Sequence, residues 1–122
     1  MTYRRVKDPK EIVVIFKSHM RDDADEVAYR RASSRMRELV SKIPGFLSVK
    51  DYTGEDGEAI DLIRFASEEA LESWRNHPEH RETQRRGREE FYDRYRVQAC
   101  RVFREYEFLV GAASSPPSDE TT

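Results

Sequence analysis

Glu11-Ile-Val-Val-Ile-Phe-Lys-Ser-His19 is the stretch that decides the fold. Branched and aromatic residues dominate it, which is typical of a β-strand. Alternate residues of a strand point to opposite faces, so one face begins with Ile12 and Val14 and the other with Val13 and Ile15. Because both faces begin apolar, the pattern predicts a strand inside a sheet that is covered on each side.

The segments that follow alternate between helical and strand patterns. Apolar residues recur at helical spacing over about 23–42, and Pro44-Gly45 ends that helix. Two strands follow at 46–53 and 58–66, joined by a hairpin loop at 54–57. A helix then begins at Ser67 and is interrupted by Pro78. A second helical piece covers about 79–92, and a long strand covers 95–108. The order β-α-β-β-α-β predicts an α+β, ferredoxin-like fold, with an antiparallel four-stranded sheet and its helices on one face.

The second face of this sheet requires a cover as well. Val13, Ile15 and alternate residues of the other strands would leave it apolar and bare. A large apolar sheet face marks an interface. We therefore expect a homodimer in which two sheets pack face to face.

Composition excludes several classes of protein. The chain has 122 residues with 22 Lys+Arg and 24 Asp+Glu, and residues 1–110 carry equal numbers of each sign, which argues against nucleic-acid or anionic-membrane binding. Its single cysteine, Cys100, excludes an internal disulfide and a cysteine-based zinc site. Early apolar runs are too short for a signal peptide or a membrane span, so we expect a cytoplasmic protein. The predicted organisation is a flexible N-terminus at 1–10, one domain at 11–110 and a disordered tail at 111–122.

One short stretch, Trp74-Arg-Asn-His-Pro-Glu-His-Arg81, concentrates the chemistry, because it holds the chain's only Trp and two of its three His. With Trp74 on the inner side of its helix, His80 can point into the same space after the break at Pro78. An imidazole beside an aromatic wall suits a general base or a haem ligand. The alternative is that Trp74 is a core anchor and His80 an ordinary polar cap. His77 reads as a helix-terminus residue. The two histidines lack a third ligand nearby, so we expect no metal site.

Several other residues are weaker candidates. His19 ends the first strand on the side of Val13, at the rim of the dimer-side cavity or simply in solvent, and Tyr52 or Tyr95 can line a pocket for a flat ligand. Arginines and glutamates between residues 82 and 90 indicate a solvated helix face, and Gly87 among them suggests close backbone packing. Cys100 reads as a small buried residue.

Taken together, the chain resembles the antibiotic biosynthesis monooxygenase superfamily, whose members are dimeric α+β barrel proteins. The resemblance covers about residues 11–108. It rests on Ile12-Val-Val-Ile-Phe16, Pro44-Gly45-Phe46, Glu69-Ala70-Leu71, the series Trp74, His80, Arg81, Gln84, Gly87 and Arg88, and then Tyr95-Arg96 and Arg104-Glu-Tyr106.

The resemblance implies two chemistries. Cofactor-free members oxidise phenols or quinols with O2 after a base removes the phenolic proton. In this chain the base would be His80 and the wall of the substrate pocket Trp74. The substrate-binding residues would be Tyr52, Tyr95, His19 and Arg81. Haem-degrading members use a His ligand, a Trp and an Asn, which would make His80 the axial ligand. In those enzymes the ligand falls near the position of Gln84, and the first strand here has no Asn. A third reading is a dimer that binds a small aromatic molecule without turnover.

Overall fold

The computed structural model describes residues 2–111, which form two compact units. The larger unit spans Glu11–Arg101. Its elements are the strands β2 (Ile12–Met20), β3 (Phe46–Thr53), β4 (Ala59–Phe65) and β5 (Tyr92–Arg101), the helices α1 (Glu26–Val40), α2 (Glu68–Arg75) and α3 (Pro78–Arg86), and the π-helical turn η1 (Gly87–Phe91).

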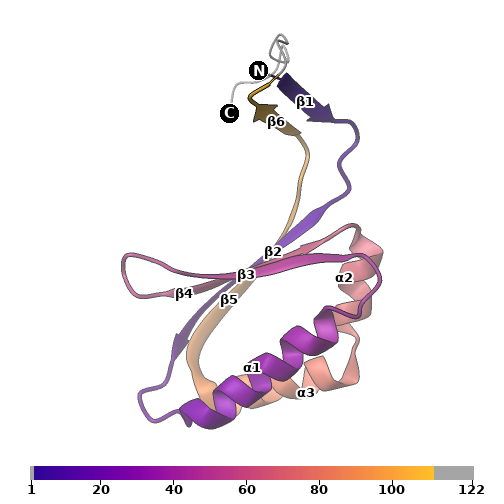
Figure 1. Cartoon of the computed structure of the whole chain (residues 1–122). Helices are drawn as coiled ribbons and strands as arrows, with labels where there is room; N and C mark the ends of the chain where they lie inside the picture. Colours follow the sequence, from indigo (N-terminus) through magenta and orange to yellow (C-terminus); the bar gives the residue numbers. More distant parts are fainter. Residues whose placement is uncertain (1, 112–122) are drawn as a thin grey trace. The chain divides into compact units, whose positions relative to one another are not determined.

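The four strands form one antiparallel sheet in the order β3-β4-β2-β5. All three α-helices lie on one face of this sheet (Figure 1). The arrangement confirms the predicted α+β, ferredoxin-like fold, with β2 as an inner strand between β4 and β5. Both edges of β2 are therefore paired with neighbouring strands, which is the position inside the sheet that its apolar pattern predicted.

Local capping sets where the helices begin. The Asp25 side chain accepts hydrogen bonds from the first-turn amides of α1, and Ser67 does the same for α2. His77 caps α3, because its Nδ1 accepts the amide of Glu79 at 3.2 Å, and Pro78 takes the first helical position. The predicted interruption at Pro78 and the terminal role of His77 are both confirmed.

The smaller unit is a two-stranded ribbon that the sequence did not predict. It contains β1 (Thr2–Val6), which pairs antiparallel with β6 (Glu105–Leu109). The predicted flexible segment 1–10 therefore contains a strand, and the long strand at 95–108 is two strands separated at residues 102–104. The larger unit ends at Arg101, and residues 102–110 of the predicted domain belong to the smaller unit. Residues 112–122 of the predicted tail lie outside the described residues.

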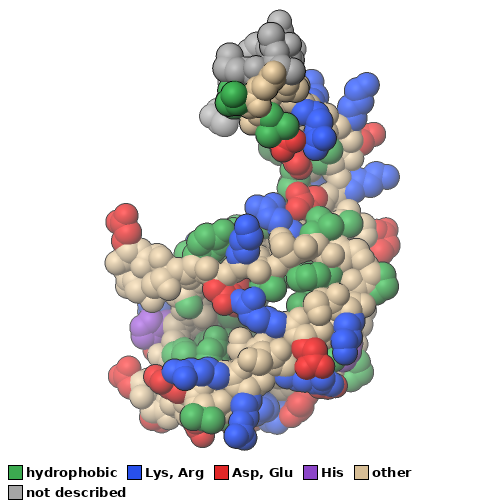
Figure 2. Space-filling view, in the orientation of Figure 1, with side chains coloured by type: hydrophobic (Ala, Val, Ile, Leu, Met, Phe, Trp, Pro, Cys, Tyr) green, Lys and Arg blue, Asp and Glu red, His purple; other side chains and the backbone are tan. Residues whose placement is uncertain are grey.

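The core of the larger unit is concentrated under one half of the sheet. Its buried cluster packs the C-terminal half of α1 and the length of α2 against the sheet, through Ile12, Val14, Val40, Phe65, Ala70 and Trp74. Under the other half of the sheet, aromatic and polar side chains face the space between the helices and the sheet. Figure 2 shows the space between sheet and α1 as a hollow with hydrophobic side chains inside it.

The opposite face of the sheet follows from the strand register. Ile15 pairs with Leu62 and Lys17 with Ile60, so these residues share the face that the helices do not cover. Cys100, opposite Val13, is exposed on this sheet, so its predicted burial is wrong. Within residues 2–111 no helix combines the length and apolarity that a membrane crossing requires.

Candidate functional site

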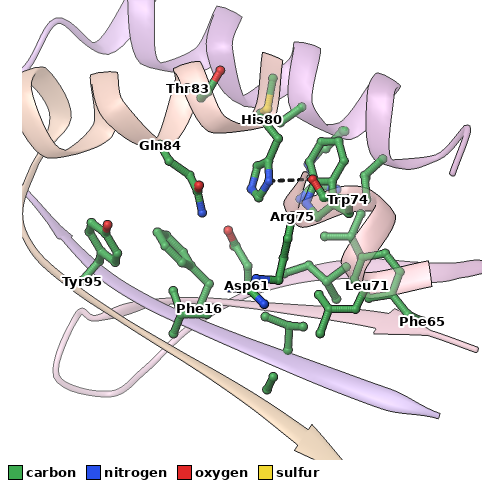
Figure 3. A pocket seen from close by; sticks show the side chains of 18 of the residues that line it. Phe16, Asp61, Phe65, Leu71, Trp74, Arg75, His80, Thr83, Gln84 and Tyr95 are labelled. Atoms are coloured by element: carbon green, nitrogen blue, oxygen red, sulfur yellow. Dashed lines mark hydrogen bonds between the residues drawn. The ribbon is translucent and has the colours of Figure 1, made fainter. Parts of the chain in front are cut away.

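A cavity of about 590 Å³ lies between the helices and the sheet of the larger unit. Volumes of this size hold small organic ligands. Its sheet wall includes Phe16 and Asp61, and α3 contributes His80, Thr83 and Gln84. Figure 3 shows His80 and Gln84 pointing from α3 toward the sheet, and Phe16 and Asp61 on the sheet side of the cavity facing them. The cavity is thus built by side chains from every helix and strand of the unit.

His80 and Trp74 meet at this cavity in a defined geometry. Their rings stack with centroids 4.2 Å apart and planes 18° apart. The Nδ1 atom of His80 lies 3.0 Å from the backbone carbonyl oxygen of Trp74, at the end of α2 (Figure 3). Because a carbonyl oxygen only accepts hydrogen bonds, Nδ1 must carry the proton and donate it. Nε2 is then left with a lone pair on the far edge of the ring.

The surroundings of His80 keep its imidazole neutral. Burial lowers the pKa of His80 below the ordinary 6.5, and the hydrogen bond to Trp74 opposes this effect only in part. A charged His77 nearby would lower it further. At neutral pH the ring therefore offers an unprotonated nitrogen, which is the form that a general base or a metal ligand requires.

The end of α3 shapes the neighbouring wall. Gln84 lies one helical turn beyond His80 and lines the cavity with it. At the following turn, Gly87 begins the π-helical η1, and a side-chain carbon placed on Gly87 would stand 3.0 Å from the ring of Tyr92. The close packing predicted for Gly87 is therefore present, and it seats the Tyr92 ring directly against the helix backbone.

A pair of carboxyl groups on the sheet forms the wall opposite α3. Asp61 on β4 lies directly across from Asp51 on β3, and both line the cavity. Arg37 of α1 forms an ion pair with Asp51. Burial and then the hydrogen bond and charge of Asp51 raise the pKa of Asp61 to about 7, and Arg37 offsets only part of that rise. Asp61 is thus largely a neutral carboxylic acid in slightly acidic solution.

Aromatic side chains surround this carboxyl pair. Phe16 stacks with Tyr95 at 5.4 Å between ring centroids and meets Tyr92 edge-on at 5.5 Å. Burial and the neighbouring Tyr29 raise the pKa of Tyr92 well above its usual range, so its hydroxyl stays protonated. The result is a largely aromatic slot with hydroxyl groups, suited to a flat ligand.

Charged side chains that line the cavity are paired with one another. Besides Arg37 with Asp51, the cavity holds the pairs Arg75–Glu72 at 3.0 Å and Arg101–Glu68. Each arginine of the wall therefore already has an acidic partner. With Asp61 protonated the lining is close to neutral, which favours an uncharged ligand over a polyanion.

The predicted site residues divide into two groups. Trp74, His80 and Tyr95 line the cavity together. The other three predicted residues do not. His19 pairs with Asp93, with Nδ1 2.9 Å from a carboxylate oxygen; Tyr52 is half exposed on the sheet face away from the helices; Arg81 is exposed on α3. The structure thus brings three of the six predicted residues together at the cavity, and their roles stay predictions.

Asp61, Asp51 and Arg37 are candidate site residues that the sequence analysis missed. One local signal was present for Asp61. It stands in the apolar strand Ala59-Ile-Asp-Leu-Ile-Arg-Phe65, in phase with the helix-facing Ile63 and Phe65. Carboxyl groups seldom occupy such inward positions without a specific role.

Comparison with known proteins places the chain in a family. A family model described as antibiotic biosynthesis monooxygenase matches residues 11–86, well over half of the chain. The match includes Trp74, His80, Asp61 and Asp51, and it ends before the tyrosines of β5. The chain belongs to the antibiotic biosynthesis monooxygenase family.

Individual proteins are also similar to the chain. The chain is 31% identical over 104 residues to the uncharacterized protein YqjZ of Bacillus subtilis, which covers 85% of this chain and 90% of that protein. The structure of Rv0793 from Mycobacterium tuberculosis is similar with a TM-score of 0.68 and 24% identity, over 79% of this chain and 98% of that one. A mutant of SnoaB, a cofactor-independent oxygenase from Streptomyces nogalater, gives a TM-score of 0.66 at 10% identity, over 84% of this chain and 99% of that one. The two solved structures share the fold.

Proposed function

We propose that this protein is a monooxygenase that oxidises a small, flat phenol with O2 and without a cofactor. The observation that carries the proposal is the neutral His80, which is fixed by Trp74 and presents Nε2 in an aromatic cavity. His80 acts as the base, and Trp74 is the wall that aligns the ring. Family membership and the fold shared with SnoaB, a cofactor-independent oxygenase, support this choice.

The reaction balances without an external reductant. A phenol such as 1-naphthol reacts with one O2 to give the quinone and one water, because the ring supplies all four electrons. Nε2 of His80 takes the hydroxyl proton, and the phenolate passes an electron to O2 before the two radicals combine at a ring carbon. His80 returns its proton to the peroxide. Loss of the ring C–H proton then cleaves the O–O bond, which leaves a carbonyl and water.

The charge of the cavity supports an uncharged aromatic as the substrate. Arg37, Arg75 and Arg101 are each occupied by an acidic partner, so no cation of the wall stands ready for an anionic ligand. Phe16, Tyr92 and Tyr95 instead provide ring faces and edges for a flat molecule. Hydroxyl and amide groups, such as the side chain of Gln84, supply the polar contacts.

Haem binding is the second candidate, and one observation favours it. A metal-bound histidine commonly donates its other ring N–H to a carbonyl, as His80 does to Trp74. Haem would bring iron-based O2 activation, with Nε2 as its ligand. Its two propionates, however, would have to displace existing arginine pairs. A haemin titration followed at the Soret band decides between the two candidates. A stoichiometric shift of the band that is lost in His80→Ala establishes haem binding at His80. A shift that is the same in wild type and His80→Ala excludes His80 as the haem ligand.

A second copy of the chain is the proposed partner. The sheet face away from the helices carries Val13, Ile15, Ile60 and Leu62 at its centre, and all four are only half-buried in one chain. Packing two such faces together would remove this apolar area from water. We therefore propose a homodimer whose two cavities lie on the outer sides of the paired sheets.

An oxygen electrode with a panel of phenols, including 1-naphthol, tests the proposed activity. Wild-type protein is expected to consume O2. The rate of O2 uptake by His80→Ala is expected to be lower by a factor of about 10²–10⁴, the usual contribution of a general base. His77→Asn is the matched control, because asparagine preserves the helix cap and His77 lies outside the cavity lining. No uptake above the protein-free rate across the panel contradicts the proposal, as does full activity in His80→Ala.

A further inference from the structure

The charged side chains that line the cavity do not cancel one another completely. Besides the histidine, three arginines and four acids line it: Arg37, Arg75, Arg101, Asp51, Asp61, Glu68 and Glu72. Each arginine forms an ion pair with a different acid, and Asp61 is the acid left over among the residues that the structure describes. The cavity wall therefore carries one unpaired negative charge whenever Asp61 is ionised.

Asp61 lies where a cation would also meet aromatic rings. Its side chain faces the space between the sheet and α3 (Figure 3). Its paired neighbours on the same face of the sheet are Asp51 on β3 and Phe16 on β2. Residues paired in this way have their Cβ atoms about 4.5–5.5 Å apart, so a cation at Asp61 would lie beside the ring of Phe16. Tyr92 and Tyr95, which contact that ring, extend the aromatic surface, and ring faces attract cations.

A proton now occupies the place that such a cation would take. Arg37 neutralises Asp51, and the proton of the carboxyl pair lies between Asp61 and Asp51. Burial, and then the hydrogen bond and charge of Asp51, raise the pKa of Asp61 to about 7. An ammonium group carries three N–H donors and a positive charge, so it can replace this proton and bond to both carboxylates.

We propose that the cavity binds a flat aromatic amine as its ammonium ion, with the ammonium at Asp61 and the ring against Phe16 and the tyrosines of β5. The carboxyl proton that the ammonium displaces passes to solvent. One positive charge then meets the one unpaired negative charge of the wall, whereas a second positive charge would be buried without a partner. Binding of such an amine requires no oxidation, so its test is separate from that of the proposed reaction.

Other titratable and charged groups face the same space and bear on the pH dependence of binding. They are Asp51 from β3, Arg37 and Tyr29 from α1, Glu68, Glu72 and Arg75 from α2, His80 from α3, and Tyr92, Tyr95 and Arg101 from β5. Burial lowers the pKa of His80 below 6.5, so this ring gains a positive charge only in acidic solution. A charged His80 would also repel an ammonium, and the test must therefore separate His80 from Asp61.

A matched pair of naphthalenes measures the preference for charge. 1-Naphthylmethylamine and 1-naphthylmethanol share their rings, but the first carries an ammonium and the second a neutral hydroxyl between about pH 6 and about pH 8. Titration calorimetry at both pH values gives the two affinities. Repeating it in two buffers of different ionisation enthalpy gives the number of protons released on binding.

Wild-type protein is expected to bind the amine about tenfold or more tightly than the alcohol at pH 8, the usual advantage of a hydrogen bond to a charged group. With a pKa of about 7, Asp61 holds its proton in about nine of ten molecules at pH 6 and in about one of ten at pH 8. The amine should therefore release nearly one proton at pH 6 and almost none at pH 8, and bind about tenfold more weakly at pH 6. The alcohol should release almost none at either pH.

Asp61→Asn removes the charge and keeps the shape of the side chain. This variant should bind the amine about tenfold or more weakly than wild type at pH 8 and release almost no proton at pH 6. It should bind the alcohol as wild type does, which shows that the cavity is intact. Asp93→Asn changes a carboxylate outside the cavity lining and should behave as wild type throughout.

Several results would overturn the assignment of a cation site to Asp61. Equal affinity of wild type for the two compounds at pH 8 is one. Proton release that persists in Asp61→Asn is another, since that proton would come from His80. Absence of binding by both compounds also overturns it, because the cavity would then accept neither ring. The predicted pattern combined with absent O2 uptake from 1-naphthol would retain the cation site and discard the oxidation.

Discussion

Two side chains with inverted acidities face the same space. His80 ordinarily takes up a proton more readily than a carboxylate does, yet burial lowers its pKa while burial and Asp51 raise that of Asp61 to about 7. In neutral solution the imidazole is therefore mainly the free base, while the carboxyl group still holds its proton in about half of the molecules. Groups whose environments move their pKa values in opposite directions are suited to divide the base and acid roles of one reaction.

Long-range ¹H–¹⁵N NMR of the histidine side chains checks this description of His80. We expect an unprotonated Nε2 and a protonated Nδ1 at pH 7, with a titration midpoint below 6.5, because folding disfavours the charged ring. Protons then bind the unfolded chain more readily than the folded one just below pH 6.5, so this group makes the fold less stable as the pH falls through that window. A charged His80 at pH 7, or a proton on Nε2, would contradict the assignment.

The site residues that the sequence could predict are those that lie close together along the chain. Trp74 and His80 are six positions apart, so one helix end and one proline break were enough to bring them together. Asp61 meets Asp51 only through strand pairing, and Arg37 reaches Asp51 from a separate helix. A single sequence carries no pattern that links those three positions.

The junction between α1 and β3 shows how an element depends on one residue. Gly45 adopts φ +91°, in the left-handed region, and its carbonyl accepts the Ala66 amide at 2.7 Å. A Cβ at Gly45 would lie 2.7 Å from the Cβ of Ala70, in the first turn of α2. The turn therefore seats α2 against the end of α1, close to the Trp74 wall.

Gly45→Ala is expected to lower the free energy of unfolding by about 2–4 kcal/mol, from left-handed strain together with the clash. Gly57→Ala is the matched control: Gly57 also has positive φ, at +84°, but nothing lies within 4 Å of its missing Cβ. It should cost only about 1–2 kcal/mol, the strain alone. Urea unfolding of both variants measures the difference, and equal losses would show that the contact with Ala70 is unimportant.

At the element scale, local patterns identified the strands and helices of the larger unit but not the ribbon. Proline, glycine and capping residues mark the ends of α1, α2 and α3 within a few positions. Thr2–Val6 holds two arginines and lacks an apolar alternation, and it becomes a strand by pairing with Glu105–Leu109. That partner is about a hundred residues away, beyond the reach of any local pattern.

In the larger unit both faces of the sheet are apolar, but helices cover only one of them. Eight hydrophobic residues in the described chain are buried, a small core for a unit of this size. The helix layer leaves the cavity on its side of the sheet, and the residues around Ile15 and Leu62 remain half-buried on the other. A dimer would complete the core, and the cavity would remain open to ligand.

Leu62→Lys tests the dimer at the centre of that face. A lysine there would have to be buried without a partner, so we expect the dissociation constant of the dimer to rise at least about a hundredfold. Ser34→Lys, which adds the same charge on an exposed residue of α1, is the control and should leave the dimer intact. Light scattering after size exclusion gives the mass. A monomeric wild type, or an unaffected Leu62→Lys, would contradict the proposed interface.

Labelling with ¹⁸O₂ tests the proposed cofactor-free monooxygenation. Metal-depleted protein is supplied with 1-naphthol under ¹⁸O₂, and the products are analysed by mass spectrometry. We predict one O2 consumed per naphthol, one labelled oxygen in the quinone and one in water, with formation of the quinone abolished in His80→Ala and retained in His77→Asn. Unlabelled quinone, accumulation of hydrogen peroxide in place of water, or equal rates in the two variants would contradict the proposed reaction.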